Sequence, residues 1–224
     1  MAKRFVYRAI TAAPFVKAEE TEFTWFSGFS KTQKQRSIES LHNSFLERNP
    51  ELKVLEASRK GKDELGNRLS AFNLELKEGS DSKPVEVLFQ GSKVFKSTKS
   101  GQIYQPVEIY DMTPLEAKAE MRKYTGGDTQ DYELVRFSFR GKDFPLEPKD
   151  FFYNWLYIRA LNCNPEMMSE LIEYDAFTDI EFNPERQFNC QAIACAIYVG
   201  LTKSGQLDEA VKSPEDFLKV VYGG

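Results

Sequence analysis

The segment from Val85 to Phe95, VEVLFQGSKVF, constrains the fold more than any other part of the sequence because it is apolar almost throughout. Within it, Glu86, Gln90 and Lys93 follow one another at spacings of four and three residues. In a helix, this spacing places a carboxylate, an amide and an amine on one narrow stripe. The other faces must be buried, so the stripe either reaches solvent through a gap or faces a polar ligand in a pocket. Periodicity alone leaves both interpretations open.

The composition is that of a chain that folds without covalent staples. Its 224 residues are 41% hydrophobic and 13% aromatic, enough to fill the core of one large domain or two small ones. The three cysteines, Cys163, Cys190 and Cys195, are odd in number and lack CxxC spacing, which favours a reducing compartment and argues against a structural metal. Because the sequence has neither a signal-peptide pattern nor a long uncharged apolar run, we expect a soluble cytoplasmic protein without a membrane partner.

The charge of the chain limits how it could bind a polyanion. A net charge of −4 gives no general attraction to nucleic acid, so such binding needs a local basic site. Residues 31–36 and 59–62 are candidates, although clusters of this kind are more often solvated surface.

Hydrophobic periodicity predicts the order of the elements. We expect a β-rich N-terminal extension over residues 1–30, a helix over 35–48, a strand over 69–79, a turn over 79–83 and then the apolar helix. A polar connection over 96–105 precedes a helix that begins at Thr113 and Pro114 and ends at Gly126 and Gly127. A hairpin turning at residues 140–143, helices over 150–161 and 164–174, an extended segment and two C-terminal helices complete the pattern. The fold class is therefore α+β: one predominantly helical domain of residues 1–224 with small antiparallel β elements.

The extended segment FTDIEFNP carries two carboxylates in alternation. If it is a strand, Asp179, Glu181 and Asn183 project from one face. The pattern fits an ordinary half-exposed strand. It also suits a reaction that needs one base and one group that stabilises a cation.

Several chemistries lack the residues they require. The only histidine, His42, lies opposite the apolar stripe of its predicted helix, where a surface or boundary role is expected, and no GxSxG elbow accompanies it. The dinucleotide-binding, P-loop and zincin motifs are absent from the sequence. The aromatic run of residues 151–157 suits a core, although Tyr153 or Trp155 could stack on a base.

Several sequence blocks together resemble the NADAR family, also called YbiA-like. VEVLFQGSKVF matches the E-x-x-x-Q-x-x-K helix of that family, TPLEAKAEMR its P-x-x-A-K element, and FTDIEFNPERQFNCQA a C-terminal block. The blocks KQRSIESLH, ELGNRLSAFNL and LEPKDFFYNWLYIRAL are similar to the branch encoded beside DarT-type toxins, which ADP-ribosylate guanine in DNA. The resemblance covers residues 23 to 200. It departs from the wider family where LSAF replaces LSNF at 69–72 and where PERQFN replaces a tryptophan-glycine pair.

The resemblance implies a YbiA-like fold and an N-glycosidase that removes ADP-ribose from ADP-ribosylated guanine in DNA or nucleotide. The protein would act as antitoxin to a DarT-type toxin, release ADP-ribose and need neither metal nor cofactor. One alternative is an N-glycosidase of riboflavin-pathway intermediates, as related members are thought to be. Another is a non-catalytic protein that binds ADP-ribose or sequesters the toxin.

The chemistry of such a reaction assigns roles to the residues already described. Glu86, partnered by Asp179 or Glu181, would stabilise the cationic ribose or activate water. Lys93 would act as an acid or as an amine nucleophile that forms a Schiff base. The remaining residues are expected to bind phosphate, hydroxyl groups or the base, and they are Lys34, Arg36, Ser70, Phe72, Phe89, Gln90, Trp155, Asn183 and Asn189.

Overall fold

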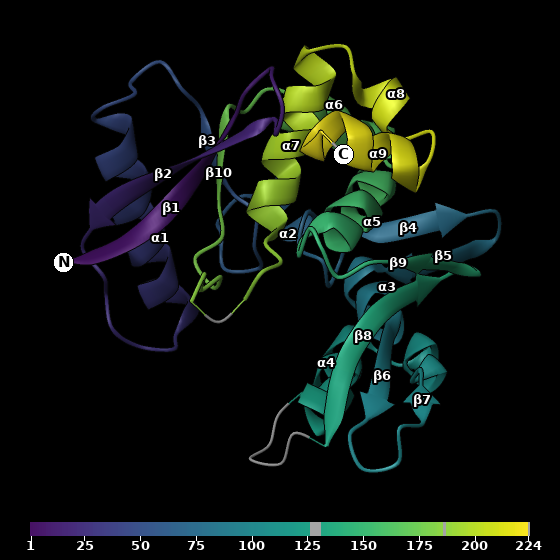
Figure 1. Cartoon of the computed structure of the whole chain (residues 1–224). Helices are drawn as coiled ribbons and strands as arrows, with labels where there is room; N and C mark the ends of the chain where they lie inside the picture. Colours follow the sequence, from purple (N-terminus) through teal and green to yellow (C-terminus); the bar gives the residue numbers. More distant parts are fainter. Residues whose placement is uncertain (126–130, 186, 224) are drawn as a thin grey trace. The chain divides into compact units, whose positions relative to one another are not determined.

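A computed structural model describes residues 1–125, 131–185 and 187–223 of the chain (Figure 1). The chain divides into two compact units, one formed by residues 1–70 with 161–224 and the other by residues 71–160. With 41% helix and 22% strand, the structure confirms the predicted α+β class, while strands contribute more than "predominantly helical" implies. The single NADAR-like domain stays a prediction. Within the described residues, no helix combines the length and the apolar character that crossing a membrane requires.

The first unit, residues 1–70 with 161–224, is built on a four-stranded sheet. Its order is β2 (Val16–Phe23), β1 (Ala2–Ala9), β10 (Ala176–Thr178) and β3 (Val54–Glu56). β1 runs antiparallel to both of its neighbours, whereas β10 and β3 are parallel. The long β1–β2 pair forms the β-rich segment expected within residues 1–30. Because β10 lies between β1 and β3, the sheet joins two strands from the first 56 residues to a strand that begins at Ala176.

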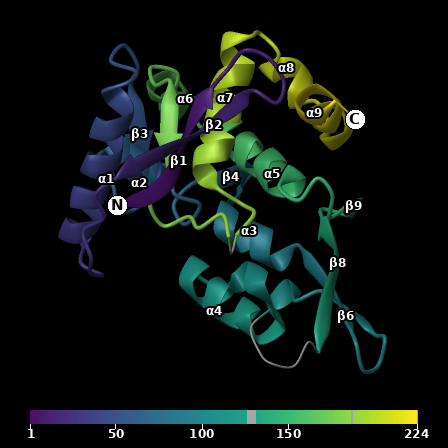
Figure 2. The same cartoon turned by 60° about the vertical axis from the view of Figure 1, so that its left-hand side comes forward.

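Helices cover both faces of this sheet (Figure 2). α1 packs on β2, and α7 packs on β1 and β10. The helices of this unit are α1 (Lys31–Leu46), α2 (Glu64–Arg68), α6 (Pro165–Leu171), α7 (Gln191–Lys203), α8 (Leu207–Ala210) and α9 (Pro214–Tyr222). α1 begins four residues before the predicted start because the Ser30 hydroxyl accepts a hydrogen bond from the Gln33 amide and caps it.

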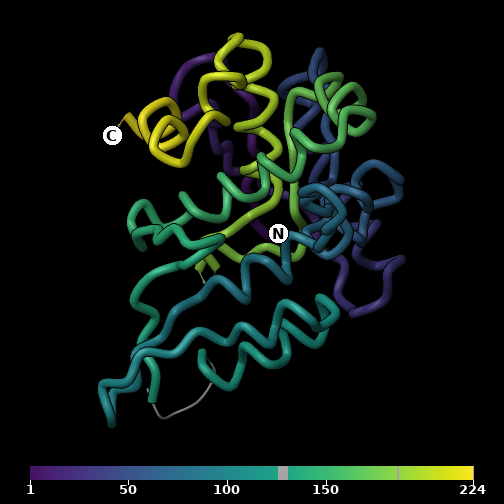
Figure 3. Tube along the Cα trace, turned by 90° about the vertical axis from the view of Figure 1, so that its right-hand side faces the viewer, coloured from purple at the N-terminus to yellow at the C-terminus, as the bar shows by residue number. Residues whose placement is uncertain are grey.

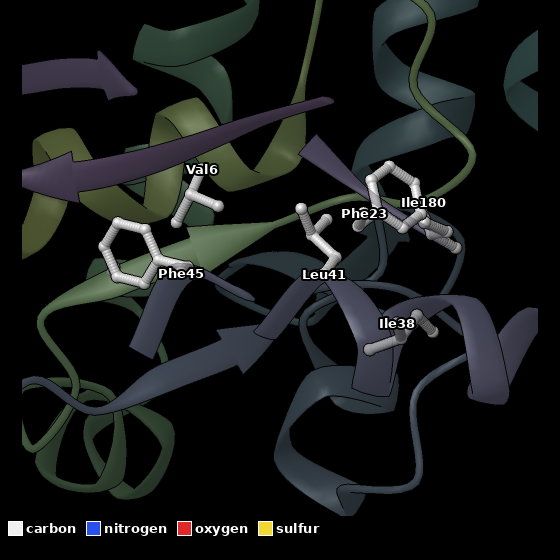
Figure 4. Packing of buried hydrophobic residues seen from close by; sticks show 7 residues of the cluster. Val6, Phe23, Ile38, Leu41, Phe45 and Ile180 are labelled. Atoms are coloured by element: carbon white, nitrogen blue, oxygen red, sulfur yellow. The ribbon is translucent and has the colours of Figure 1, made fainter. Parts of the chain in front are cut away.

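The core between α1 and the sheet follows the predicted helical stripe (Figure 4). Ile38, Leu41 and Phe45 of α1 pack with Val6 of β1 and Phe23 of β2. Ala176 and Ile180 complete the cluster. Each large side chain buried here contributes about 1.5–3 kcal/mol of transfer free energy. This packing holds α1 firmly against the strands.

The second unit, residues 71–160, combines a four-stranded sheet with a hairpin and helices. Figure 3 traces this part of the chain in teal and green. The sheet order is β7 (Ile103–Tyr104), β6 (Lys93–Ser97), β8 (Tyr132–Phe139) and β9 (Lys142–Phe144). The hairpin pairs β4 (Glu75–Glu78) with β5 (Asp81–Pro84). The helices are α3 (Val85–Gly91), η1 (Val107–Asp111), α4 (Pro114–Thr125) and α5 (Phe151–Asn162), the last two residues of which belong to the first unit.

Several boundaries in the second unit differ from the predictions. The strand predicted over residues 69–79 is confined to β4, because the carbonyls of Ala71 and Leu74 accept the first amides of α3, at 2.8 and 2.9 Å. The predicted turn over 79–83 is shorter, since β5 begins at Asp81, and the connection over 96–105 contains β7. α4 begins as predicted, whereas its predicted end at residues 126 and 127 lies outside the described residues.

The hairpin predicted around residues 140–143 is confirmed. Arg140 and Gly141 connect β8 to β9 with φ angles of 51° and 77°. Positive φ at both central positions is the requirement of a type I′ turn, whose twist matches that of the flanking strands.

Candidate active site

Glu86, Gln90 and Lys93 form one hydrogen-bonded ladder, although Lys93 does not lie on the helix as predicted. α3 ends at Gly91, and Lys93 is the first residue of β6. The Gln90 amide donates to Glu86 Oε1 at 2.9 Å, and Lys93 Nζ donates to Gln90 Oε1 at 2.7 Å. Glu86 and Gln90 are each only 8% exposed. The amide therefore links a buried carboxylate to a partly buried amine, as the spacing indicated.

The environment of Lys93 destabilises its charged form and so lowers its pKa. Burial lowers the pKa of the Lys93 amine to about 8, against the opposing effect of the Glu86 carboxylate. The positive charge of Lys118 lowers this pKa further. The amine also lies 4.8 Å from the centre of the Phe89 ring. Close to neutral pH, an appreciable fraction of Lys93 is thus a free amine.

Lys118 is a neighbour of this ladder to which the sequence analysis gave no role. It is the lysine of the P-x-x-A-K element, on the second turn of α4, and Ala117 beside it is fully buried. The Lys118 amine lies 5.6 Å from the centre of the Phe72 ring. The P-x-x-A-K motif was the sequence signal that could have identified Lys118. In the structure its alanine packs in the core while the adjacent lysine stays exposed.

The two aromatic residues expected in a base pocket lie in the aromatic core of the second unit. Phe89 packs against Phe137 and Tyr153, with ring centres 5.4 and 5.2 Å apart. Trp155 is 4% exposed, and its indole N–H is buried without a hydrogen-bond partner in the part of the chain that is described. Their contact with a base therefore stays a prediction.

The predicted acidic strand is wrong in one respect, because β10 ends at Thr178. The Phe182 amide donates to the Asp179 carbonyl at 3.2 Å and closes a turn there. Asp179 Oδ1 accepts from the Glu181 amide at 3.1 Å, which stabilises the same turn. Asp179, Glu181 and Asn183 consequently do not line one strand face. Asp179 is half-buried, whereas Glu181 is exposed and lies 3.8 Å from the Lys60 amine.

A second carboxylate beside Asp179 was missed by the sequence analysis. Glu56, the last residue of β3, is 3% exposed and pairs with Thr178 across the parallel strands. Its Oε1 accepts from the Ile180 amide at 2.9 Å and from the Ser58 hydroxyl, and its Oε2 lies 2.6 Å from the Thr178 hydroxyl. No local pattern marks Glu56, because its partners Thr178 and Ile180 lie 122 and 124 residues further along the sequence.

The charge of Asp179 acts on several buried groups of the first unit. Burial, and next the Asp179 charge, raise the pKa of Glu56 to about 8. Burial and the same charge raise the pKa values of the Tyr7 hydroxyl and the Cys190 thiol. These three groups belong to β3, β1 and the residue before α7. All three favour their neutral forms.

The sole histidine is linked to Glu56 through Thr178, and these three residues form the Glu56 cluster. His42 Nε2 lies 2.8 Å from the Thr178 hydroxyl, which connects α1 to Glu56. Burial lowers the pKa of His42 to about 4, so the ring is neutral at physiological pH. Its partly buried position agrees with the predicted boundary role.

The remaining predicted residues are placed as follows. Lys34 and Arg36 lie over the rings of Trp25 and Phe26, at 4.7 and 4.0 Å from the ring centres. The Asn183 side chain accepts from the Glu185 amide, and within the described ranges Asn189 Oδ1 is buried without a partner. Ser70 is buried at the end of the first unit's N-terminal segment. The residues described contain no cluster of three or more histidine, cysteine, aspartate or glutamate side chains that could hold a metal ion.

Comparison with known protein families gives one match that spans almost the whole chain. The model of the DarT1-associated NADAR antitoxins matches residues 2–224. A comparison with curated proteins finds no match. The family match agrees with the resemblance seen in the E-x-x-x-Q-x-x-K and P-x-x-A-K segments and extends it to both ends of the chain. The chain therefore belongs to the family of DarT1-associated NADAR antitoxins.

Proposed function

We propose that this protein is an N-glycosidase that removes ADP-ribose from ADP-ribosylated guanine and thereby reverses the action of a DarT-type toxin. The family description supports the antitoxin role. The observation that carries the catalytic part is the Lys93 amine. It is hydrogen-bonded to Gln90 and interacts with the Glu86 charge, and burial lowers its pKa to about 8.

The reaction breaks the bond between the anomeric carbon of ribose and a guanine nitrogen. Positive charge develops on the sugar as the bond lengthens, so a carboxylate close to that carbon stabilises the transition state more than the ground state. Glu86 and Asp179 are the carboxylates proposed for this role. The departing guanine nitrogen takes a proton, which Lys93 in its ammonium form supplies, while water activated by one carboxylate forms the new bond to the anomeric carbon.

A second route uses Lys93 as a nucleophile. The neutral amine attacks the anomeric carbon of the ring-opened ribose, the carbon–guanine bond breaks, and guanine leaves with a proton. The resulting imine joins Lys93 Nζ to the sugar. Water then hydrolyses it, which releases ADP-ribose and restores the amine. A lysine with a pKa of about 8 suits this route, because the free amine is present without a strong base.

Trapping with borohydride separates the two routes. If Lys93 forms an imine, reduction during turnover leaves a covalent sugar adduct on Lys93 that mass spectrometry locates. Lys93→Arg is the matched control, since it retains the charge but cannot form this imine. No adduct under single-turnover conditions, with turnover otherwise normal, would leave the acid route.

The proposed function itself is tested with a guanine-ADP-ribosylated oligonucleotide. We expect mass analysis to show loss of the whole ADP-ribosyl group with the base intact, and EDTA to leave the rate unchanged. Glu86→Gln should abolish release while retaining affinity for the modified oligonucleotide. If Glu86→Gln still rescues cells from the toxin, sequestration rather than catalysis accounts for the antitoxin effect. Turnover of a riboflavin-pathway intermediate in place of the oligonucleotide would favour the alternative glycosidase.

A further inference from the structure

The side chain of Glu56 contacts the chain on both sides of Asp179. Thr178, directly before Asp179, has its hydroxyl 2.6 Å from Glu56 Oε2. The amide of Ile180, directly after Asp179, donates to Glu56 Oε1 at 2.9 Å. A backbone bond from the Ala57 amide to the Thr178 carbonyl, at 2.8 Å, adds a third attachment. Asp179 therefore sits on a short backbone segment that Glu56 holds at each end.

We propose that Glu56 is a positioning residue for Asp179, which it holds through Thr178 and the Ile180 amide while the pair shares a single negative charge. This inference rests on the proposed function only in assigning Asp179 to the ribose. Glu56 is 3% exposed, so it acts through Asp179 rather than on substrate. Since two neighbouring carboxylates resist double ionisation, the buried Glu56 holds the proton and the half-buried Asp179 carries the charge.

The charged groups around Glu56 are consistent with this division. Asp179 acts on it directly and disfavours its ionised form. His42 faces it through Thr178 and is neutral. Lys60, on the loop after β3, pairs with Glu181, and its own amide donates to the Ser58 hydroxyl at 3.2 Å. Burial and the Asp179 charge make Tyr7 and Cys190 favour their neutral forms.

The hydrogen-bond chain makes the location of the proton measurable. Glu56 Oε1 already accepts from the Ser58 hydroxyl and the Ile180 amide, so a proton on Glu56 resides on Oε2 and is donated to Thr178. Thr178 then donates to His42 Nε2, and the imidazole proton lies on Nδ1. When Glu56 loses its proton, Thr178 turns to donate to the carboxylate. His42 Nε2 must then carry the hydrogen and donate to Thr178. Ionisation of Glu56 thus exchanges the tautomer of a neutral histidine.

Nitrogen NMR of the histidine ring tests the shared proton without any activity assay. His42 is the only histidine, so its signals need no assignment. We expect the wild-type ring to change from the Nδ1–H to the Nε2–H tautomer as pH rises through about 8. In Glu56→Gln, the amide nitrogen takes the place of Oε2 and donates permanently to Thr178, so the Nδ1–H tautomer should persist to pH 9.5. A wild-type ring that keeps one tautomer from pH 6 to 9.5 would overturn the shared proton.

Kinetics test the positioning role. Glu56→Ala should lower kcat on the modified oligonucleotide at least tenfold with KM changed less than twofold. Thr21→Val is the control, since Thr21 is another buried hydroxyl of the first unit, bonded to Arg48 on the far side of β1. Glu56→Gln should retain most of the rate at pH 7, and its kcat should fall less than that of wild type as pH rises through about 8. A Glu56→Ala rate equal to that of Thr21→Val would overturn the positioning role.

The two hypotheses fail in different ways. If Asp179→Asn retains the wild-type rate, the proposed use of Asp179 is wrong, whereas the histidine signals still report on Glu56. If Glu56→Ala does not fold, the Glu56→Gln tautomer and its pH profile decide the question.

Discussion

The ladder of the second unit and the Glu56 cluster of the first unit are both buried polar networks, but they are built differently. The ladder joins residues that are close in sequence: Glu86 to Gln90, four residues apart, and Gln90 to Lys93, three residues apart. The Glu56 cluster joins β3, β10 and α1, with partners up to 136 residues apart. Burial makes the charged form costly in both, so it lowers the pKa of the Lys93 amine and raises the pKa of the Glu56 acid. The same physical cause therefore produces a candidate nucleophile and a candidate proton carrier.

The largest expected effect comes from removing the amine of the ladder. Lys93→Met should lower the rate on the modified oligonucleotide at least about 10³-fold, because both routes require the amine. The same variant should raise the free energy of unfolding at pH 7 by about 1–2 kcal/mol. The folded-state pKa of Lys93 lies below its ordinary value, so the stability cost is full below pH 8 and disappears above pH 10.5. Urea unfolding at pH 7 and 10.5 measures both limits. A variant that is less stable than wild type at pH 7 would contradict the proposed burial.

The next effect disrupts the backbone beside Glu56. A methyl group at Gly66 would lie 2.1 Å from the Glu56 carbonyl oxygen, so Gly66→Ala should lower the free energy of unfolding by about 3 kcal/mol or more. Gly79→Ala is a control, because its φ of +62° costs about 1 kcal/mol with no atom within 4 Å. Equal losses of unfolding free energy in both variants, measured in urea, would contradict the close approach of Gly66 in α2 to the Glu56 carbonyl in β3.

The two networks differ in how far they could be predicted. The spacing of Glu86, Gln90 and Lys93 gave the ladder, even though the helix stops at Gly91. The hydroxyl of Ser92 closes the last turn by donating to the Leu88 carbonyl, and Lys93 still reaches Gln90 from the start of β6. The α1 stripe, the α4 cap and the β8–β9 turn were also predicted, since each depends on neighbouring residues. Glu56 and its bond to Thr178 could not be predicted, because strand pairing across 122 residues leaves no local pattern. The acidic strand was overextended because alternation in burial persists beyond Thr178 although the backbone turns.

A smaller effect distinguishes the two networks by the sign of their pH dependence. The folded-state pKa of Glu56 is raised, so its stability contribution is complete below pH 4.5 and is lost as pH rises to about 8. Glu56→Gln lacks this loss. The free energy of unfolding of Glu56→Gln minus that of wild type should therefore increase by about 2–4 kcal/mol when the pH is raised from 5 to 9. Parallel stability curves of the two proteins over this range would contradict a raised pKa.

The smallest effect refines the account of Lys93. Lys118→Met removes a positive charge that lowers the pKa of the Lys93 amine, so that pKa should rise slightly. The alkaline dependence of borohydride trapping should move by the same amount. Lys118→Arg, which keeps the charge, should leave it in place. An equal shift in both variants would point to packing on Phe72 rather than to charge.

The central position of β10 in its sheet has a consequence for biosynthesis. β1 and β3 leave the ribosome early, but the strand that separates them follows Glu56 by 122 residues. At about 5–20 residues per second, roughly 6–24 s pass in which these strands lack their shared neighbour. A nascent chain interrupted in that interval exposes unpaired edges and is a target for proteolysis or aggregation. The supply of working antitoxin is thus coupled to completed translation.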